Sequence, residues 1–228
     1  MKRYFVILAL LLLATSVQAQ RIKAYVAGGF TASHIEGDEL YGFHKWGGMF
    51  GVGALAPIAP NNRVKFGVEA DYTLRGAKNT SGVPYNINLP LQYVDIPLTI
   101  YYNDPKAGFA FGAGLTFGRL VQQPHDTISF GPAFIPDTNN LHFLTNDFLF
   151  HMEARFQVWE WIFFSIRYQR SIMPINSMTF TEDAATPPTY TNDCFNTSVQ
   201  CRLELQFGDP NESSKGYRGK KKYHKRRR

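Results

Sequence analysis

Three side chains in the sequence, His151, Glu153 and Ser165, could together form a hydrolytic site. A serine nucleophile, a histidine base and a carboxylate that orients the base are the groups that lipid hydrolases built on membrane barrels use. This chemistry requires all three within hydrogen-bonding reach of one another and of a substrate. Whether they can act therefore depends on the elements that carry them and on the face that each residue occupies.

A second set of charged residues recurs at every other position along several segments. Alternation with a period of two places these side chains on one face of a β-strand. Because the set contains both signs, its members could pair with one another. The set consists of Lys23, Lys65, Glu69, Asp71, Asp95, Glu153, Arg155, Arg167, Arg202 and Glu204. Cysteine and histidine show no metal-ligand spacing and no glycine loop suits a phosphate, so neither a metal nor a cofactor is expected.

A closing strand is predicted at residues 197–207, where Val199, Cys201, Leu203, Leu205 and Phe207 alternate with polar residues. Seven further segments show similar alternation, at 22–33, 46–56, 63–75, 89–103, 107–119, 147–158 and 161–170. These lengths are close to the roughly 9 to 11 residues that a tilted strand needs to cross a bilayer. The connections alternate between long and short, with the long ones at 34–45, 76–88, 120–146 and 171–193, which is typical of outer-membrane barrels.

The segment 107–119 gives the strongest indication of which face meets lipid. Its bulky residues alternate with glycine and alanine: Phe109, Phe111, Ala113, Leu115 and Phe117 oppose Gly108, Ala110, Gly112, Gly114 and Gly118. Bulk outside and glycine inside is the reverse of a sandwich core. We therefore expect an all-β protein, an eight-stranded antiparallel up-and-down transmembrane β-barrel. A soluble β-sandwich or a lipocalin-like lipid binder is the alternative fold.

The two ends of the chain differ from this barrel segment. Residues 1–19 combine Lys2 and Arg3 with a short apolar run and small residues, as in a secretory signal peptide. Residues 20–207 are expected to form the barrel and are mildly acidic, whereas 208–228 hold nine of the 24 lysines and arginines. This tail is either solvated and disordered or a periplasmic tether to an anionic surface or protein. The tether residues would be Lys220, Lys221, Lys222, Lys225, Arg226, Arg227 and Arg228.

The two cysteines, Cys194 and Cys201, do not indicate a disulfide scaffold. Cys201 lies on the apolar face of its strand and Cys194 in or near a loop, so a mutual bond is not expected. Nucleic acid is not an expected partner of the basic tail because an exported protein does not share its compartment.

The sequence resembles the PorT-like outer-membrane β-barrel proteins of Bacteroidetes-type bacteria. The resemblance rests on Gly42-Phe43-His44-Lys45, Gly67-Val68-Glu69, Tyr72, Arg75-Gly76-Ala77 and Leu91-Gln92-Tyr93-Val94-Asp95-Ile96-Pro97-Leu98. It implies location in the outer membrane, and the founding member of the family is associated with the type IX secretion system. Phe207 also resembles the aromatic end-signal that the barrel-insertion machinery reads.

These observations favour a non-catalytic structural or accessory barrel. Eight strands leave a lumen that side chains fill, so we expect the charged set to pair into a plug, and an ion path is the lesser alternative. His151, Glu153 and Ser165 would then face a lumen that no lipid enters, although a lipid-modifying barrel enzyme stays open as the runner-up. Expected partners are outer-membrane lipid, the insertion machinery and secretion-system proteins.

Overall fold

The computed structural model describes residues 22–38, 42–59, 63–79, 86–104, 107–123, 128–129, 143–181 and 189–207. Within these ranges no helix is long and apolar enough to cross a membrane. The described chain forms strands β1 (Lys23–Glu36), β2 (Lys45–Pro57), β3 (Val64–Lys78), β4 (Asn86–Asp104), β5 (Phe109–Gln122), β6 (Ile128–Ser129), β7 (Asn146–Gln157), β8 (Ile162–Ser171), β9 (Asn176–Thr181) and β10 (Thr189–Phe207).

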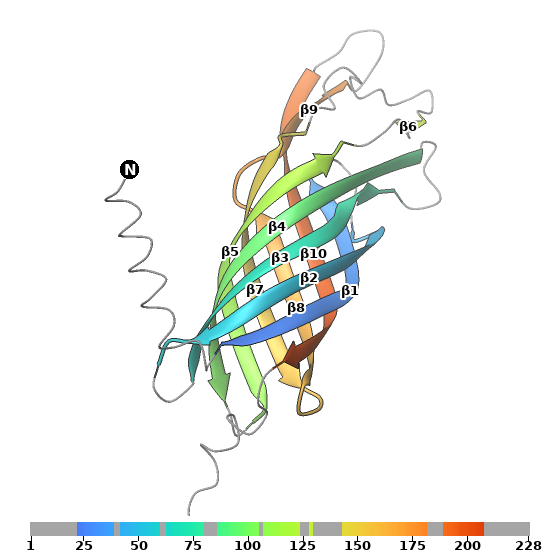
Figure 1. The fold of residues 1–228 in the computed structure, drawn as a ribbon. Coiled ribbons are helices and arrows are strands. Elements are labelled where there is room, and N and C mark those ends of the chain that lie inside the picture. Colours follow the sequence, from blue (N-terminus) through green and yellow to red (C-terminus); the bar gives the residue numbers. More distant parts are fainter. Residues whose placement is uncertain are drawn as a thin grey trace, which may run out of the picture.

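Eight of these strands close into an antiparallel barrel (Figure 1). They pair in the order β1-β2-β3-β4-β5-β7-β8-β10, and β10 pairs with β1 from Ala24 opposite Phe207 to Glu36 opposite Phe195. The predicted eight-stranded antiparallel barrel is therefore confirmed. The short turns and the paired ends of β1 and β10 share one end of the barrel, which in outer-membrane barrels is periplasmic. We call the opposite end the outer end.

The prediction that residues 120–146 and 171–193 are irregular throughout is wrong. β10 begins at Thr189, and its first residues pair with β9 to form a two-stranded ribbon beyond the barrel wall. β6 pairs with the start of β4, and β5 continues to Gln122. Strand β9 has only six residues and few apolar ones, so the pattern used to find strands in the sequence did not register the ribbon.

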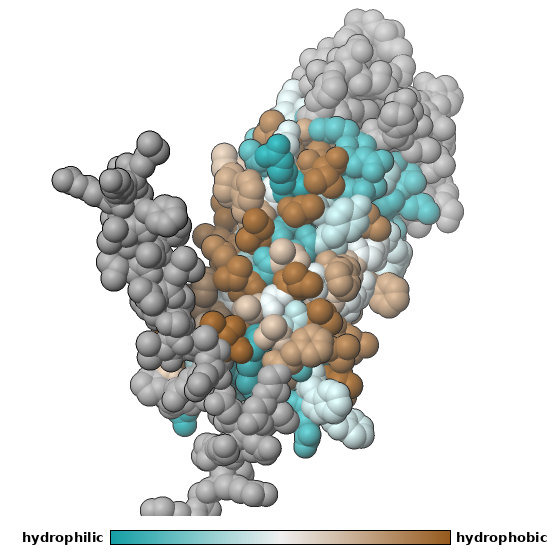
Figure 2. Space-filling view, in the orientation of Figure 1, coloured by the Kyte–Doolittle hydropathy of each residue, from teal (hydrophilic) through white to brown (hydrophobic). Residues whose placement is uncertain are grey.

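The barrel wall is apolar on its outside, as Figure 2 shows by a hydrophobic band below more hydrophilic residues at the outer end. Phe30 and Trp46 are each 72% exposed and Leu115 is 59% exposed. Such side chains are unfavourable in water and suit the hydrocarbon core of a bilayer. A soluble lipid binder would have the opposite polarity, with apolar side chains lining its lumen, so this alternative is not supported.

The lumen is filled by three layers of buried side chains. An apolar cluster of Tyr25, Ala27, Leu55 and Tyr101 lies toward the periplasmic end. A larger apolar cluster closes the outer end, formed by Ile35, Ala77, Leu89, Leu91, Tyr93, Leu120, Phe143, Ile175, Met178 and Cys194. Between the two clusters lie the buried charged residues. Gly112 makes room for this packing, because a Cβ at that position would lie 2.6 Å from Cδ1 of Tyr101.

The predicted signal peptide (1–19) and the basic tail (208–228) lie outside the described residues. Their boundaries and roles stay predictions.

Candidate functional site: the charged lumen

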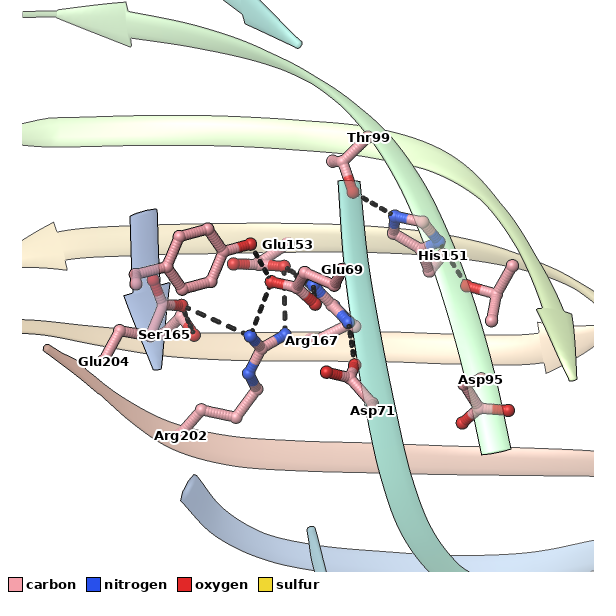
Figure 3. Close-up of polar contacts among 12 residues, drawn as sticks. Glu69, Asp71, Asp95, Thr99, His151, Glu153, Ser165, Arg167, Arg202 and Glu204 are labelled. Carbon is pink, nitrogen blue, oxygen red and sulfur yellow. Dashed lines mark hydrogen bonds and ion pairs between the residues drawn. The ribbon is translucent and has the colours of Figure 1, made fainter. Parts of the chain in front are cut away.

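Arg167 on β8 is the centre of the charged layer (Figure 3). Its Nη2 lies 2.6 Å from Oε2 of Glu69 and its Nη1 lies 3.1 Å from Oδ2 of Asp71, both on β3. Its Nε also donates to Oε2 of Glu153 on β7, at 2.7 Å. One fully buried guanidinium therefore joins three carboxylates from two strands on different sides of the barrel.

Two more arginines extend this network around the lumen. Arg202 on β10 lies 2.8 Å from Glu69 through Nη2 and 3.5 Å from Glu153 through Nη1. Arg155 on β7 pairs with Glu204 on β10. Because each arginine has five donors in a planar fork, it can hold several carboxylates at once. The result is a continuous cross-link between β3, β7, β8 and β10.

Two tyrosines pack against the periplasmic side of this layer. Tyr25 donates to Glu69, and Tyr101 donates to Oε2 of Glu153 at 3.2 Å. The Cζ atom of Arg155 lies 5.4 Å from the Tyr25 ring centroid and 5.1 Å from that of Tyr101. The charged layer thus merges into the apolar cluster below it through groups that are both aromatic and polar.

Asp95 belongs to a separate network closer to the outer end. It pairs with Arg75 on β3, whose Nη1 also lies 3.6 Å from Oδ2 of Asp147 on β7. Asn196 on β10 donates to Asp147 and to the hydroxyl of Tyr93, each at 3.1 Å. Arg75 and Asp147 are not in the charged set predicted from the sequence. The alternation of β3 could have identified Arg75, because it continues the inward series of Glu69, Asp71 and Thr73.

One lysine of the predicted set, Lys65, does not join these networks among the described residues. Lys65 lies near the periplasmic end, opposite Tyr101 on β4 and Pro57 on β2. Among the described residues it has no carboxylate partner, so the prediction that it joins the ion-pair core is not supported. Lys65 is only the second residue of β3, and its side chain remains below the level of the carboxylates. Lys23, the first residue of β1, is likewise half-buried at this end.

His151, Glu153 and Ser165 do not assemble into a hydrolytic site. Both ring nitrogens of His151 form hydrogen bonds with threonine hydroxyls, Nε2 with Thr99 at 2.9 Å and Nδ1 with Thr116 at 2.8 Å. The Ser165 hydroxyl donates to Oε1 of Glu204 at 2.6 Å. All of these side chains are buried in the lumen between the two apolar clusters. The lipid-modifying hypothesis required them at the lipid-facing rim, and the geometry contradicts it.

The other residues singled out in the sequence lie away from the charged layer. Phe207 ends β10 and faces outward, 56% exposed. Cys194 and Cys201 are both free; Cys194 is buried in the outer apolar cluster and Cys201 is exposed on the outside. Within the described ranges no group of histidine, cysteine and acidic side chains could hold a metal ion.

The match to a protein-family model agrees with the outer-membrane barrel fold. Residues 5–202 match the family described as "Outer membrane protein beta-barrel domain". The chain belongs to this family. Together with the apolar exterior, membership of the outer membrane protein family confirms location in the outer membrane. No curated protein matches the sequence at a significant level.

Among solved structures, the chain is similar to several small outer-membrane barrels. Neisserial surface protein A is 12% identical with a TM-score of 0.44, and the match covers 81% of this chain and 97% of that one. Ail of Yersinia pestis is 9% identical with a TM-score of 0.42, covering 81% and 98%. A major outer membrane protein of Thermus thermophilus is 11% identical with a TM-score of 0.39, covering 82% and 98%. At these values the likenesses carry no information about function.

Proposed function

We propose that this outer-membrane barrel is a non-conducting, non-catalytic structural component that acts as an accessory part of the type IX secretion machinery. The filled lumen is the observation that supports a non-conducting, structural barrel. Arg167 and its three carboxylate partners cross the lumen between two apolar clusters, so the described side chains fill the lumen at three successive levels.

The secretion role rests on the resemblance of these motifs to the PorT-like family. Several of the motif residues also build the lumen. Glu69 belongs to the central network, and Arg75 pairs with Asp95. Leu91 and Tyr93 belong to the outer apolar cluster. Gly76 has a backbone φ of +132°, a conformation that residues with a Cβ atom rarely adopt. The motif residues therefore specify a rigid plugged barrel, which suits a protein that anchors or organises others.

Reconstitution into a planar bilayer tests the absence of conduction. The full-length protein should give no discrete current steps, while an open porin reconstituted in the same way gives them. Stepwise conductance at neutral pH would overturn the plugged-barrel part of the proposal. A gel on which the folded and heat-denatured forms migrate differently shows that the reconstituted sample is folded.

Gene deletion tests the secretion part. Deletion followed by comparison of the secreted and surface proteomes should show loss of a defined class of cargo proteins, restored by the wild-type gene. Unchanged secreted and surface proteomes would refute the secretion role and leave the barrel as a structural protein of the membrane.

The basic tail provides the point of attachment in this proposal, as an electrostatic tether to an anionic surface or protein on the periplasmic side. Clustered lysines and arginines contribute about 1 kcal/mol each near anionic lipid. Removing residues 208–228, or replacing the seven tether residues from Lys220 to Arg228 by glutamine, should reduce the set of co-purified proteins equally. An unchanged set in both variants would contradict the tether.

A further inference from the structure

The carboxyl group of Asp147, near the outer end of β7, differs from the other carboxyl groups of the two lumen networks. Its side chain is fully buried, but the closest arginine nitrogen, Nη1 of Arg75, is 3.6 Å from its Oδ2. N–H···O hydrogen bonds are about 2.7 to 3.2 Å long. In the central network around Arg167, each carboxyl group has an arginine nitrogen within 3.1 Å. Asp147 is therefore buried without a hydrogen bond from a cation.

Arg75 faces two carboxyl groups but carries one positive charge. It pairs directly with Asp95 on β4. Among the described residues no other lysine or arginine forms an ion pair with Asp95 or Asp147. With both acids ionised, this outer network would hold one uncompensated negative charge in the lumen. A buried charge without a partner is strongly unfavourable, and a like charge nearby makes the ionisation of the second acid less favourable still.

Gly118 on β5 brings the two acids close to one another. It stands opposite Asp95 in the β4–β5 pairing and opposite Asp147 in the β5–β7 pairing. A Cβ at this position would lie 2.7 Å from Oδ1 of Asp95 and 3.5 Å from the carbonyl oxygen of Asp147. The glycine therefore leaves room for the Asp95 carboxylate beside β7, and the negative charge of Asp95 faces Asp147.

The amide of Asn196 on β10 provides the partner for a neutral acid. Its Nδ2 donates to Oδ2 of Asp147 at 3.1 Å. The Oδ1 atoms of Asp147 and Asn196 are both buried and have no hydrogen-bond partner among the described residues, and Asn196 is 0% exposed. A carboxylate can only accept hydrogen bonds, whereas a protonated carboxyl group also donates one. A proton on Oδ1 of Asp147 would supply the donor that the Asn196 oxygen lacks.

The other polar groups around Asp147 are neutral. The Ser171 hydroxyl on β8 forms a hydrogen bond with Asp147 and accepts the backbone N–H of Asn196 at 3.0 Å. Asn196 also donates to the hydroxyl of Tyr93 on β4. The charged groups that face Asp147 are Arg75, which is already paired, and Asp95, which has the same sign. Neither can balance a second negative charge.

We propose that Asp147 binds a proton at neutral pH and shares it with the amide oxygen of Asn196. The proton comes from solvent and forms an O–H bond on Oδ1, while Oδ2 continues to accept from Nδ2 of the same amide. The Arg75–Asp95 ion pair then lies beside a neutral acid–amide pair, and the charges of the outer network cancel. Because a free aspartate is ionised at neutral pH, the folded chain holds one proton more than the unfolded chain, so its stability falls as the pH rises. The proposal does not depend on the secretion role.

Infrared spectroscopy of the full-length protein, folded in a detergent that has no carbonyl group, tests the proposal. At neutral pH the wild type should show the C=O stretching band of a protonated carboxyl group, which shifts to lower frequency in heavy water. Asp147→Asn should lose this band. Asn196→Ala should keep the band but shift it, because the acid loses both of its hydrogen bonds to the amide. A wild type without the band, a band kept in Asp147→Asn, or an unshifted band in Asn196→Ala would overturn the proposal.

Asp71→Asn is the matched control, because it removes a buried carboxyl group that already has an arginine nitrogen at 3.1 Å. It should leave the band unchanged, and loss of the band in this variant would overturn the proposal by placing the proton in the central network. Urea titration gives a second measure: the unfolding midpoint of the wild type should fall more than that of Asp147→Asn between about pH 7 and about pH 10. Equal falls in the two proteins would contradict the proposal. Heat-modifiable gel mobility establishes that each variant is folded.

Discussion

Arg167 and Arg170 lie three residues apart on β8 and illustrate the two faces of the barrel. Arg167 points into the lumen, is fully buried and contacts three carboxylates. Arg170 points outward, with 46% of its side chain exposed, and contacts one. The same residue type therefore plays two roles on one strand. Inside, it is the shared cation of a buried network; outside, water and lipid headgroups can substitute for its partner.

From this difference we expect the loss of a lumen cation to destabilise the barrel more than the loss of an outward-facing one. The central network joins β3, β7, β8 and β10, which are not all neighbours in the sheet. The wall contributes an apolar surface whose individual side chains each contact lipid. Four experiments test this contrast, beginning with the largest expected effect.

Replacing Arg167 by methionine should lower the free energy of unfolding by about 3 to 5 kcal/mol, because Glu69, Asp71 and Glu153 lose their shared cation while remaining buried. Urea titration in lipid vesicles, followed by tryptophan fluorescence, measures the change. Arg170→Met is the control on the same strand and should cost at most about 1 kcal/mol, as exposed pairs do. Equal losses in the two variants would contradict the distinction between lumen and wall.

Leu98→Arg places a charge in the middle of the lipid-facing wall, where Leu98 is 45% exposed opposite Leu115 and Val68. The expected cost is about 2 to 4 kcal/mol, because the guanidinium must enter the hydrocarbon core. The same urea titration applies. Gln122→Arg, at the outer end of β5, should cost about 0 to 1 kcal/mol. A wall that tolerated arginine at both depths would not be embedded in a bilayer.

Gly112→Val tests how tightly the lumen is filled. Gly112 stands opposite Tyr101, and a Cβ there would lie 2.6 Å from the tyrosine ring. Overpacking should cost about 1 to 3 kcal/mol of unfolding free energy. Combining it with Tyr101→Ala makes room for the valine, so the pair should cost less than the sum of the two single substitutions. Additive losses of unfolding free energy would show that the lumen beside Tyr101 is not tightly packed.

The smallest effect is expected at Cys194, in the part of β10 that pairs with β9 outside the membrane. Burial, and then the nearby Asp38, raise the pKa of this thiol to about 12, so it is protonated at pH 8. In a Cys201→Ser background, a water-soluble maleimide should label the folded protein far more slowly than the denatured protein. Rapid labelling of the folded form would mean that the outer apolar cluster opens to water.

Much of the fold could be predicted from the sequence because strand alternation is a local property. Phe111, Leu115 and Phe117 alternate with glycine, which indicates both a strand and the side that meets lipid, and the structure agrees. The β9–β10 ribbon was not predictable in the same way. Its strand β9 has only six residues, too few for alternation to distinguish it from a loop, although Met178 and Cys194 pack in the outer apolar cluster.

The sequence by itself determined which side chains enter the lumen, since the facing of Glu69, Glu153 and Arg202 follows from a period of two. Only the tertiary structure decided which of them meet. Arg167 and Glu69 are 98 residues apart and come together across the lumen, because closure between β1 and β10 fixes the stagger of every strand. The same closure leaves Lys65 below the carboxylates, brings Arg75 to Asp95 and Asp147, and separates His151 from Ser165.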